Sequence, residues 1–334
     1  MDSRYDVVVV GGGAAGLSGA LALSRARRSV LVVDGGAPRN APAAEMHNYL
    51  GRDGTRPADL LSAGRAEVAG YGGTVVAGDV VSATRVDDGF AVTLADGRSV
   101  GARRLLVTTG LVDELPSVPG LAERWGHDVL HCPYCHGWEV RDQAVGVLST
   151  GPGAVLKALL WRQWCTDVTL FLHTGPEPAD GEAEQLAARG IAVVTGEVAA
   201  VESAGDRLTG VRLASGRVVP RDALVVSPVF TARSEVLASL GLPVEPVEAH
   251  GHTVGSAVPS GPAGATAVPG VWVAGNVTDL MAQVITAAAA GLQAGGAINA
   301  DLVAEDVRLA VAARQAPAPA DEHELVPGPR AQRI

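Results

Sequence analysis

The stretch "YDVVVVGGGAAGLSGALALSRARRSVLVVDGG", residues 5–36, decides the fold. Its two runs rich in valine, Asp6–Val10 and Ser29–Val33, are typical of parallel strands that are covered on both faces. The small and apolar residues 14–27 between them are predicted to form a helix. A strand, a glycine turn, a helix and a second strand form the unit from which Rossmann-like α/β domains are built.

The glycine spacing in this unit predicts a dinucleotide site. Gly11, Gly13 and Gly16 stand in G-x-G-x-x-G register. In this motif the first glycine permits a tight turn, the second lets the backbone approach a pyrophosphate, and the third lets the helix pack on the strand. Asp34 ends the second strand, where an acid accepts the ribose hydroxyls. Either NAD or FAD suits such a unit.

A second segment favours FAD. Residues 270–302, "GVWVAGNVTDLMAQVITAAAAGLQAGGAINADL", are predicted to form a short strand over 271–274, a Gly-Asn turn and a long helix from about Met281. The start of a helix offers free N–H groups and a positive dipole end, which suit the electron-rich pyrimidine edge of a flavin.

The third informative stretch is "HCPYCHGWEV", residues 131–140, which holds two of the three cysteines. The C-x-x-C-H spacing is compatible with zinc, with covalent haem or with a reversible dithiol. Zinc needs two further ligands, and Cys165 with the scattered histidines supplies no second close pair. Haem attachment follows export, and no export signal precedes the first strand. The dithiol interpretation is therefore favoured, and Cys165 is predicted to be a buried helix residue.

Composition narrows the class of partner. The chain has 334 residues, 47% of them apolar, which is enough for two domains. A net charge of −10 without a Lys/Arg block argues against nucleic acid and against an anionic membrane. We expect a cytoplasmic protein, because neither a signal sequence nor an apolar run of membrane-spanning length is present.

Three motifs in order, "GGGAAG", "VTTG" at 107–110 and "VWVAGN…AQVITAAA", resemble the low-molecular-weight thioredoxin reductase family of flavoproteins over roughly residues 5–312. The resemblance implies an α/β fold of two Rossmann-like, three-layer ββα domains. A discontinuous FAD domain would comprise 1–112 and 233–312, and an inserted NAD(P)H-type domain with the CxxC would comprise 113–232. "ELPSVPG" and "SPVFTARS" would be the linkers, and 313–334 a disordered tail.

The chain is most similar to one branch of that family, the dithiol oxidases that close the disulfide of natural products such as gliotoxin and holomycin. The similarity rests on Tyr134 inside the CxxC, on His136 directly after it, where thioredoxin reductases usually have aspartate, and on the pair Trp138 and Glu139. "GAPRN", residues 36–40, resembles the loop that covers the flavin in this branch. Asn276 stands where thioredoxin reductases have an aspartate that binds the ribityl chain of FAD; its amide still accepts and donates hydrogen bonds.

The nicotinamide site of the inserted domain is predicted to be degraded. In "AVGVLSTGPGAVLKALLWRQW", Gly151 and Gly153 hold the first two motif positions, but Leu156 holds the third, where we expect its bulk to hinder packing of helix on strand. His173 follows the next strand without the arginine pair that a 2′-phosphate needs. Electrons are then expected to enter from a dithiol and to leave to molecular oxygen.

The resemblance implies the roles of the site residues. Cys132 would face the substrate and Cys135 the flavin, while His136, and His131 on the other flank, would lower the thiol pKa as imidazolium or take protons as neutral imidazole. Pro133 is expected to remove one N–H donor and so to weaken stabilisation of the thiolate. The predicted FAD-binding residues are Gly11, Gly13, Ala14, Ala15, Gly16, Asp34, Gly35, Arg39, Asn40, Thr109, Gly110, Gly275, Asn276, Gln283, Val284 and Ile285.

The predicted function is thus that of an FAD-dependent dithiol oxidase, which forms a disulfide in a small dithiol and passes electrons to O2 to give H2O2. The alternatives are an NAD(P)H-dependent reductase of thioredoxin or of a small disulfide, and a redox sensor without turnover. By the same resemblance we expect a homodimer. Tyr134 and Trp138 are expected to shape the substrate pocket, and no metal is expected.

Overall fold

The computed structural model describes residues 4–249 and 251–315. The chain divides into two compact units, residues 1–299 and 300–334. Both sheets of Rossmann type and every residue of the candidate site lie in the first unit. The second unit contributes the C-terminal part of α7 (Val284–Gln315) to the description. The disordered tail was predicted to comprise residues 313–334. Its first three residues, 313–315, belong to α7, and residues 316–334 lie outside the described residues.

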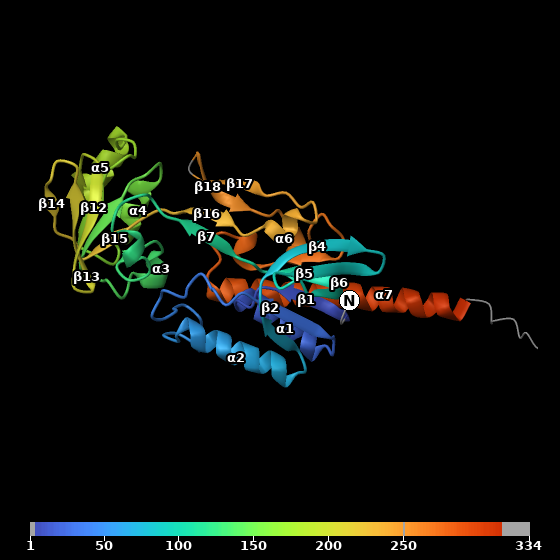
Figure 1. Cartoon of the computed structure of the whole chain (residues 1–334). Coiled ribbons are helices and arrows are strands. Elements are labelled where there is room, and N and C mark those ends of the chain that lie inside the picture. Colours follow the sequence, from blue (N-terminus) through green and yellow to red (C-terminus); the bar gives the residue numbers. More distant parts are fainter. Residues whose placement is uncertain (1–3, 250, 316–334) are drawn as a thin grey trace, which may run out of the picture. The chain divides into compact units, whose positions relative to one another are not determined.

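The first sheet is built around the glycine-turn unit. Its strand order is β3-β2-β1-β6-β5-β4, and β1, β2, β4, β5 and β6 are labelled in Figure 1. β19 pairs with the end of β6, on the edge opposite β1. β1, β2, β3, β6 and β19 are parallel, whereas β4, β5 and β6 form an antiparallel meander. The strands are β1 Arg4–Val10, β2 Val30–Asp34, β3 Thr74–Ala77, β4 Val80–Val86, β5 Gly89–Leu94, β6 Ser99–Val107 and β19 Val271–Val273.

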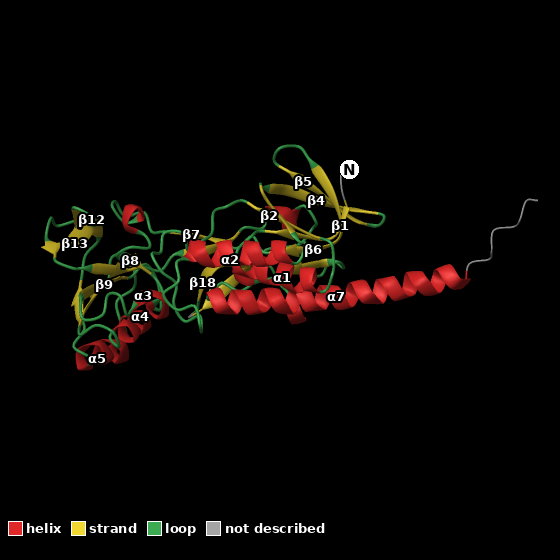
Figure 2. Cartoon of the chain, turned by 90° about the horizontal axis from the view of Figure 1, so that it is seen from below, coloured by secondary structure: helices red, strands yellow, loops and turns green. Residues whose placement is uncertain are grey.

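Close helix packing fixes this sheet's first loop. The helices are α1 Ala14–Arg25, α2 Pro57–Gly70 and α6 Glu235–Ala238, with α1 and α2 together on one side of the sheet (Figure 2). A Cβ on Gly291 of α7 would lie 1.9 Å from the carbonyl oxygen of Ala15 in α1, so only glycine permits this contact. α1 ends two residues earlier than predicted, because Arg27 is left-handed (φ 64°) and the N–H of Arg28 bonds back to the Leu23 carbonyl.

The second sheet is parallel, with strand order β11-β10-β9-β15-β8, and lies between the two parts of the first sheet in the sequence. A three-stranded antiparallel sheet, β12-β13-β14, follows β11 along the chain. The predicted α/β fold with two Rossmann-like sheets is confirmed. The elements are β8 Val129–Leu130, α3 Pro133–His136, β9 Ala144–Leu148, α4 Ala154–Trp161, β10 Asp167–Phe171, α5 Asp180–Ala188, β11 Ala192–Val194, β12 Val198–Ala204, β13 Arg207–Leu213, β14 Val218–Val219 and β15 Ala223–Val225.

The two places where the chain passes between the sheets are hydrogen-bonded to each other. β7 (Leu111–Glu114) pairs antiparallel with β16 (Val229–Ala232), so that Asp113 lies opposite Phe230. β17 (Glu245–Ala249) and β18 (His252–Ala257) complete this four-stranded sheet. Both predicted linkers therefore adjoin one sheet. The segment after β8 also contacts the segment after β2, where the Asn48 side chain donates to the Tyr134 carbonyl oxygen.

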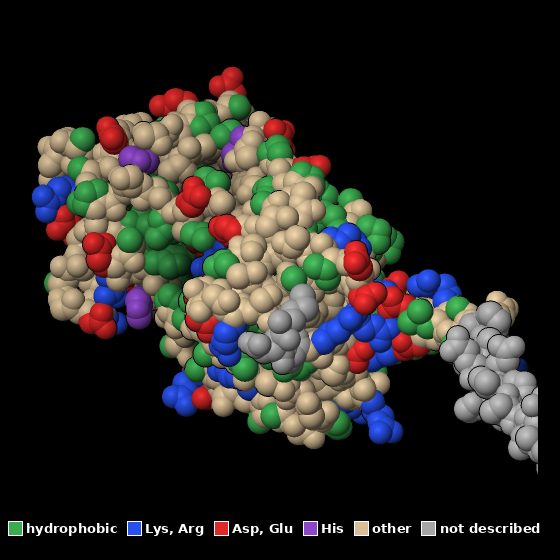
Figure 3. Space-filling model, turned by 45° about the vertical axis from the view of Figure 1, so that its right-hand side comes forward, with side chains coloured by type: hydrophobic (Ala, Val, Ile, Leu, Met, Phe, Trp, Pro, Cys, Tyr) green, Lys and Arg blue, Asp and Glu red, His purple; other side chains and the backbone are tan. Residues whose placement is uncertain are grey.

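On the face in Figure 3, basic side chains lie interspersed with acidic ones. None of the helices in the described ranges is both long and apolar enough to cross a bilayer.

Candidate active site

The glycine turn between β1 and α1 leaves one side of the backbone open. Gly11 has φ 101°, and a Cβ there would lie 2.6 Å from the Thr108 carbonyl oxygen. A Cβ on Gly16 would lie 2.0 Å from the Gly11 carbonyl oxygen, so α1 rests directly on the turn. A Cβ on Gly13 would meet no described atom within 4 Å. The second glycine therefore faces open space, where a ligand could approach the backbone.

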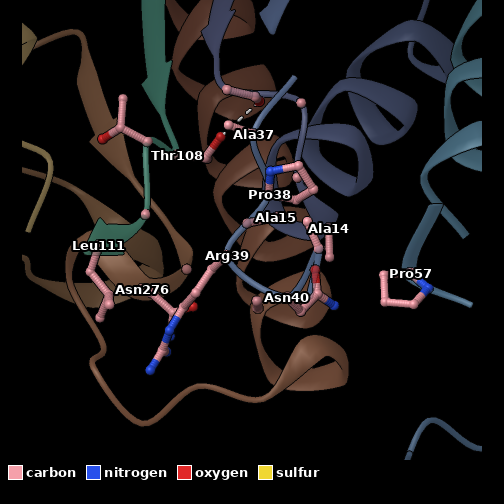
Figure 4. A pocket seen from close by; sticks show the side chains of 18 of the residues that line it. Ala14, Ala15, Ala37, Pro38, Arg39, Asn40, Pro57, Thr108, Leu111 and Asn276 are labelled. Carbon is pink, nitrogen blue, oxygen red and sulfur yellow. Dashed lines mark hydrogen bonds between the residues drawn. The ribbon is translucent and has the colours of Figure 1, made fainter. Parts of the chain in front are cut away.

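That open space is a cavity of about 710 Å³. It is lined by the turn after β1, the loop after β2, the ends of β6 and β7 and the turn before α7. Figure 4 shows Ala14, Arg39, Thr108 and Asn276 from these segments. Most predicted site residues line it: Gly11, Gly13, Ala14, Ala15, Asp34, Gly35, Arg39, Asn40, Thr109, Gly110, His131, Cys132, Cys135, Gly275, Asn276, Gln283 and Val284. Gly16, His136 and Ile285, all described, are not among the lining residues.

Asp34 lies at the end of β2, as predicted. Its Oδ1 accepts hydrogen bonds from the N–H groups of Gly12 (3.2 Å) and Gly36 (3.1 Å), and its Oδ2 lies 3.2 Å from the Arg65 guanidinium. The carboxylate is thus already oriented before any ribose hydroxyl reaches it. Arg65 of α2 was not singled out from the sequence, because an arginine in an amphipathic helix gives no signal of its own.

Asn276 organises the turn before α7. Its Nδ2 donates to the carbonyl oxygens of Asp279 and Ala282, each at 3.0 Å, and more weakly to that of Leu280 at 3.4 Å. An aspartate could not donate these bonds. The side chain holds residues 279–282 out of helical geometry, so α7 begins at Val284 rather than near Met281 as predicted.

Arg39 joins the loop after β2 to the paired strands β7 and β16. Its guanidinium donates two hydrogen bonds to Asp113, of 2.8 and 2.7 Å, and lies 5.1 Å from the centre of the Phe230 ring. The predicted cofactor-loop arginine is therefore committed to a carboxylate on β7. Its positive charge also contributes to lowering the pKa of Cys132.

The CxxC begins a one-turn helix. Cys132 precedes α3, and its carbonyl oxygen accepts from the N–H groups of Cys135 and His136, each at 3.2 Å. The segment between β2 and α2 contacts the CxxC segment: Asn48 donates to the Tyr134 carbonyl oxygen at 2.6 Å, and the His47 ring lies 3.4 Å from the Glu139 carboxylate. These contacts hold both half-buried thiols, which are not bonded to each other, at the wall of the cavity.

The two thiols differ in acidity. The pKa of Cys132 falls to about 7, because its sulfur accepts hydrogen bonds from the Cys135 thiol and from the N–H groups of Cys135 and Tyr134. The pKa of Cys135 rises, because its thiol proton is held by Cys132 and because the group is buried. The N–H groups of Cys135 and Tyr134 thus still stabilise the Cys132 thiolate, although Pro133 has no N–H. That Pro133 weakens this stabilisation stays a prediction, which a redox titration of Pro133→Ala tests.

The histidines are less basic than free imidazole. Burial, with the nearby Lys157 charge, lowers the pKa of His131 to about 3, and burial also lowers the pKa of His136. Of the two roles predicted for His131, the imidazolium role does not fit, since the ring is neutral at neutral pH. His136 lies outside the cavity lining and has Glu139 as an electrostatic neighbour.

Lys157 of α4 is the residue that sequence reasoning missed. Its Nζ lies 2.6 Å from Ser227 Oγ, 3.1 Å from the Val226 carbonyl oxygen and 3.3 Å from His131 Nδ1. A signal was present: it is the only lysine in the sequence, and every other member of the 26 lysines and arginines is an arginine. A single lysine inside the apolar run "AVLKALLW" is a candidate functional group.

The second glycine turn corrects one expectation. Leu156 is 55% exposed, so it does not hinder packing of α4 on its sheet. Ala154 and Ala158 take the buried positions instead, and Gly153 makes the turn with φ 89°. The prediction of a degraded nicotinamide site is therefore supported only by the residues after β10, which include no arginine pair for a 2′-phosphate. There the His173 Nδ1 accepts a hydrogen bond from the N–H of Val198 at 3.0 Å.

In the described part of the chain, no three His, Cys, Asp or Glu side chains are arranged as a metal site. A glycine turn at a cavity, with a CxxC in the same wall, defines a disulfide oxidoreductase of the two-domain dinucleotide-binding class.

The comparisons place the chain within that class. Residues 5–291 match the pyridine nucleotide-disulphide oxidoreductase family, so the chain belongs to this family. The thioredoxin reductase tcpT of Claviceps purpurea (strain 20.1) is 32% identical over 315 residues, covering 90% of this chain and 95% of that protein. The thioredoxin reductase sirT of Leptosphaeria maculans is 31% identical over 322 residues, covering 91% and 96%.

Among solved structures, the crystal structure of HlmI is 48% identical and superposes with a TM-score of 0.85, covering 93% of this chain and 96% of that one. The family resemblance predicted from the motifs is confirmed by these comparisons.

Proposed function

We propose that the protein is an FAD-dependent dithiol oxidase. It would form a disulfide within a small dithiol through Cys132 and Cys135 and pass the electrons to O2, giving H2O2. One observation carries the proposal: both thiols line the cavity onto which the glycine turn of β1 and α1 opens. A redox pair in the wall of this cavity would exchange electrons with a flavin bound there.

The residues of the cavity fit FAD. Gly13 presents bare backbone to it, and the N-terminus of α1 supports a pyrophosphate there. Asp34 suits the ribose hydroxyls, and the turn held by Asn276 precedes the N-terminus of α7, which suits the pyrimidine edge of a flavin. When bound, FAD would supply a two-electron acceptor that O2 reoxidises.

The chain's own residues perform the thiol exchange. A substrate thiolate attacks Cys132, the bond between Cys132 and Cys135 breaks, and a mixed disulfide forms. The second substrate thiolate attacks the substrate sulfur of that mixed disulfide and releases Cys132. The N–H groups of Tyr134 and Cys135 stabilise the released thiolate, which is the form that the lowered pKa of Cys132 favours.

The surroundings of the CxxC favour a small apolar substrate. Tyr134 is 57% exposed and packs edge-on against Trp164. Trp138 is 66% exposed, with the Arg141 guanidinium 4.2 Å from its ring centre. Exposed aromatic side chains beside a reactive pair offer a stacking surface for a flat or cyclic dithiol.

The alternative is an NAD(P)H-dependent reductase of thioredoxin or of a small disulfide. The family match and the left-handed turn at Gly153 favour it, since such a turn precedes a nucleotide-binding helix. Against it, the residues after β10 are His173, Thr174 and Gly175, followed by acidic Glu177 and Asp180, and they offer no cation for a 2′-phosphate. The homodimer and the cytoplasmic location stay predictions.

An anaerobic titration tests the proposal. The FAD-loaded protein is mixed in turn with dithiothreitol, NADH and NADPH while flavin absorbance is followed. We expect the dithiol alone to bleach the flavin and, after admission of air, to give one H2O2 for each disulfide formed. Cys135→Ser should abolish bleaching, whereas Cys165→Ser, a buried position whose sulfur donates to the Val140 carbonyl, should not. Fast bleaching by NADPH would establish the reductase instead.

A further inference from the structure

The charge of Lys157 is not matched by any carboxylate of the described residues. The ammonium has three N–H donors, and three acceptors surround it: the Ser227 hydroxyl, the Val226 carbonyl and His131 Nδ1. Among the described residues, no Asp or Glu lies within ion-pair distance of it, and its single electrostatic partner of opposite sign is Cys132. Charges inside proteins are generally paired. The Cys132 thiolate is therefore the natural counter-ion of Lys157.

Arg39, whose charge lowers the pKa of Cys132, is already paired. Its two hydrogen bonds to Asp113 leave that charge largely neutralised before the thiolate forms. Lys157 is thus the cation whose charge the thiolate itself must balance. The remaining groups that act on this site are Cys135 and His136 of α3 and His131 before it, and both histidines are held neutral by burial.

Lys157 also contacts His131. Nδ1 of His131 lies 3.3 Å from the Lys157 Nζ and 3.3 Å from the Val226 carbonyl oxygen, so it accepts from the ammonium when the ring proton is on Nε2 and donates to the carbonyl when the proton is on Nδ1. His131 is fixed from its other side by edge-on contact with Phe230, at 5.1 Å between ring centres. The neutral His131 ring is therefore held between Lys157 and Phe230.

We propose that Lys157 is a positioning residue for the dithiol chemistry, acting as the counter-ion of the Cys132 thiolate and holding the neutral ring of His131, which precedes Cys132. The proposal rests on the proposed function for the reaction that generates the thiolate. When a substrate dithiol reduces the Cys132–Cys135 bond, one S–S bond breaks and one forms. The two substrate thiols release two protons. One proton goes to the Cys135 sulfur and the other to the Lys157 amine, so that the Cys132 thiolate and the Lys157 ammonium appear together.

This role explains why the residue is lysine. In the disulfide form no thiolate is present, and a permanent cation at this position would be unpaired. Burial lowers the pKa of Lys157 to about 8, so the amine can release its proton when the disulfide closes. Arginine cannot lose its charge in a protein. The chain, which uses arginine at every other cationic position, keeps its single lysine here.

The test measures the Cys132 thiolate directly and needs neither O2 nor turnover. In the full-length, FAD-loaded Cys135→Ser protein, the rate of alkylation of Cys132 by iodoacetamide is followed against pH and assigned by peptide mass spectrometry. We expect Lys157→Met to raise the apparent pKa of Cys132 by about one unit or more, a tenfold loss of thiolate below the pKa. Lys157→Arg should stay within a few tenths of the parent.

Leu156→Met, one residue earlier and 55% exposed, is the matched control and should change nothing. Lys157→Gln, which keeps polar contacts without the charge, should behave like Lys157→Met and replaces it if that variant does not fold. An unchanged pKa of Cys132 in both neutral variants would overturn the proposal. If the pKa moves but the wild type yields no peroxide from dithiols, the thiolate pairing is supported and the oxidase function fails instead.

Discussion

The Arg39 guanidinium donates two hydrogen bonds, of 2.8 and 2.7 Å, to the Asp113 carboxylate, and the Asp113 side chain is only 8% exposed. The pair joins the loop that lines the cofactor cavity to β7, one of the two linker strands. Since Asp113 also lies opposite Phe230 of β16, one guanidinium is in contact with both β7 and β16. This contact helps to hold the CxxC segment at the cavity.

We expect Arg39→Met to lower the free energy of unfolding by about 3 kcal/mol, because it leaves a buried carboxylate without its partner. Denaturant unfolding of the FAD-loaded protein measures this. The double variant Arg39→Met/Asp113→Leu should recover part of the loss, since it removes the unpaired charge as well. Equal stability of the single variant and the wild type would show that the pair contributes nothing.

The pH dependence of thiol reactivity follows from the lowered pKa of Cys132. In the reduced protein its thiolate is present above pH of about 7 and is lost as the pH falls through that value. Alkylation of Cys132 should therefore rise between pH 6 and 8 and then level off, at roughly the thiolate fraction that each pH allows. Cys165, whose pKa is raised by burial, is the internal control and should stay slow throughout. A Cys132 profile that rises only above pH 8.5 contradicts the hydrogen bonding described at α3.

Two glycines of the turn between β1 and α1 allow FAD binding and folding to be tested separately. Gly13→Ala should leave the stability of the flavin-free protein nearly unchanged, because no described atom lies within 4 Å of the new methyl group and the backbone φ is −76°. It should nevertheless weaken FAD binding at least tenfold, about 1.4 kcal/mol, by filling the space that a pyrophosphate needs.

Gly11→Ala is the contrasting variant, since its methyl would meet the Thr108 carbonyl oxygen at 2.6 Å and its φ is 101°. It should destabilise the fold itself by about 1–3 kcal/mol. Fluorescence titration of apoprotein with FAD and thermal unfolding distinguish the two effects. Undiminished FAD affinity in Gly13→Ala would place the cofactor elsewhere.

The exposed aromatic beside the CxxC is predicted to bind substrate. Trp138→Ala should change the free energy of unfolding by no more than about 0.5 kcal/mol. It should raise KM for an apolar cyclic dithiol severalfold while kcat with dithiothreitol stays constant. Tyr71→Ala is the matched control: Tyr71 is 55% exposed and also faces a guanidinium, that of Arg25 at 5.3 Å. If both variants leave KM unchanged, Trp138 has no part in recognition.

Local sequence patterns predicted the fold well where the residues that define an element all lie within one short segment. The valines of β1 and β2 and the spacing of Gly11, Gly13 and Gly16 specify a strand, turn and helix without distant help, and the elements lie within a few residues of their predicted bounds. The boundary errors have local tertiary causes, such as the Asn276 amide that delays the start of α7.

Pattern reasoning failed where side-chain direction mattered. Leu156 has the third motif position in sequence but is 55% exposed, and Ala154 and Ala158 take the buried positions of α4 instead. The histidines beside the CxxC were assigned by proximity in sequence, yet acidity depends on burial and on charges from other elements. Lys157 lies 26 residues from His131 and touches it only in the folded chain.

The sequence by itself determined the α/β fold, the dinucleotide turn and the reactive cysteine pair, because each depends on residues spaced within a single turn or strand. Only the tertiary structure decided which cations lie near the thiols, that the histidines on both sides of the CxxC stay neutral, and that the cysteines share a cavity with the glycine turn. Electrostatic interactions act through space and through loss of solvent, and folding brings together groups that the linear order keeps apart.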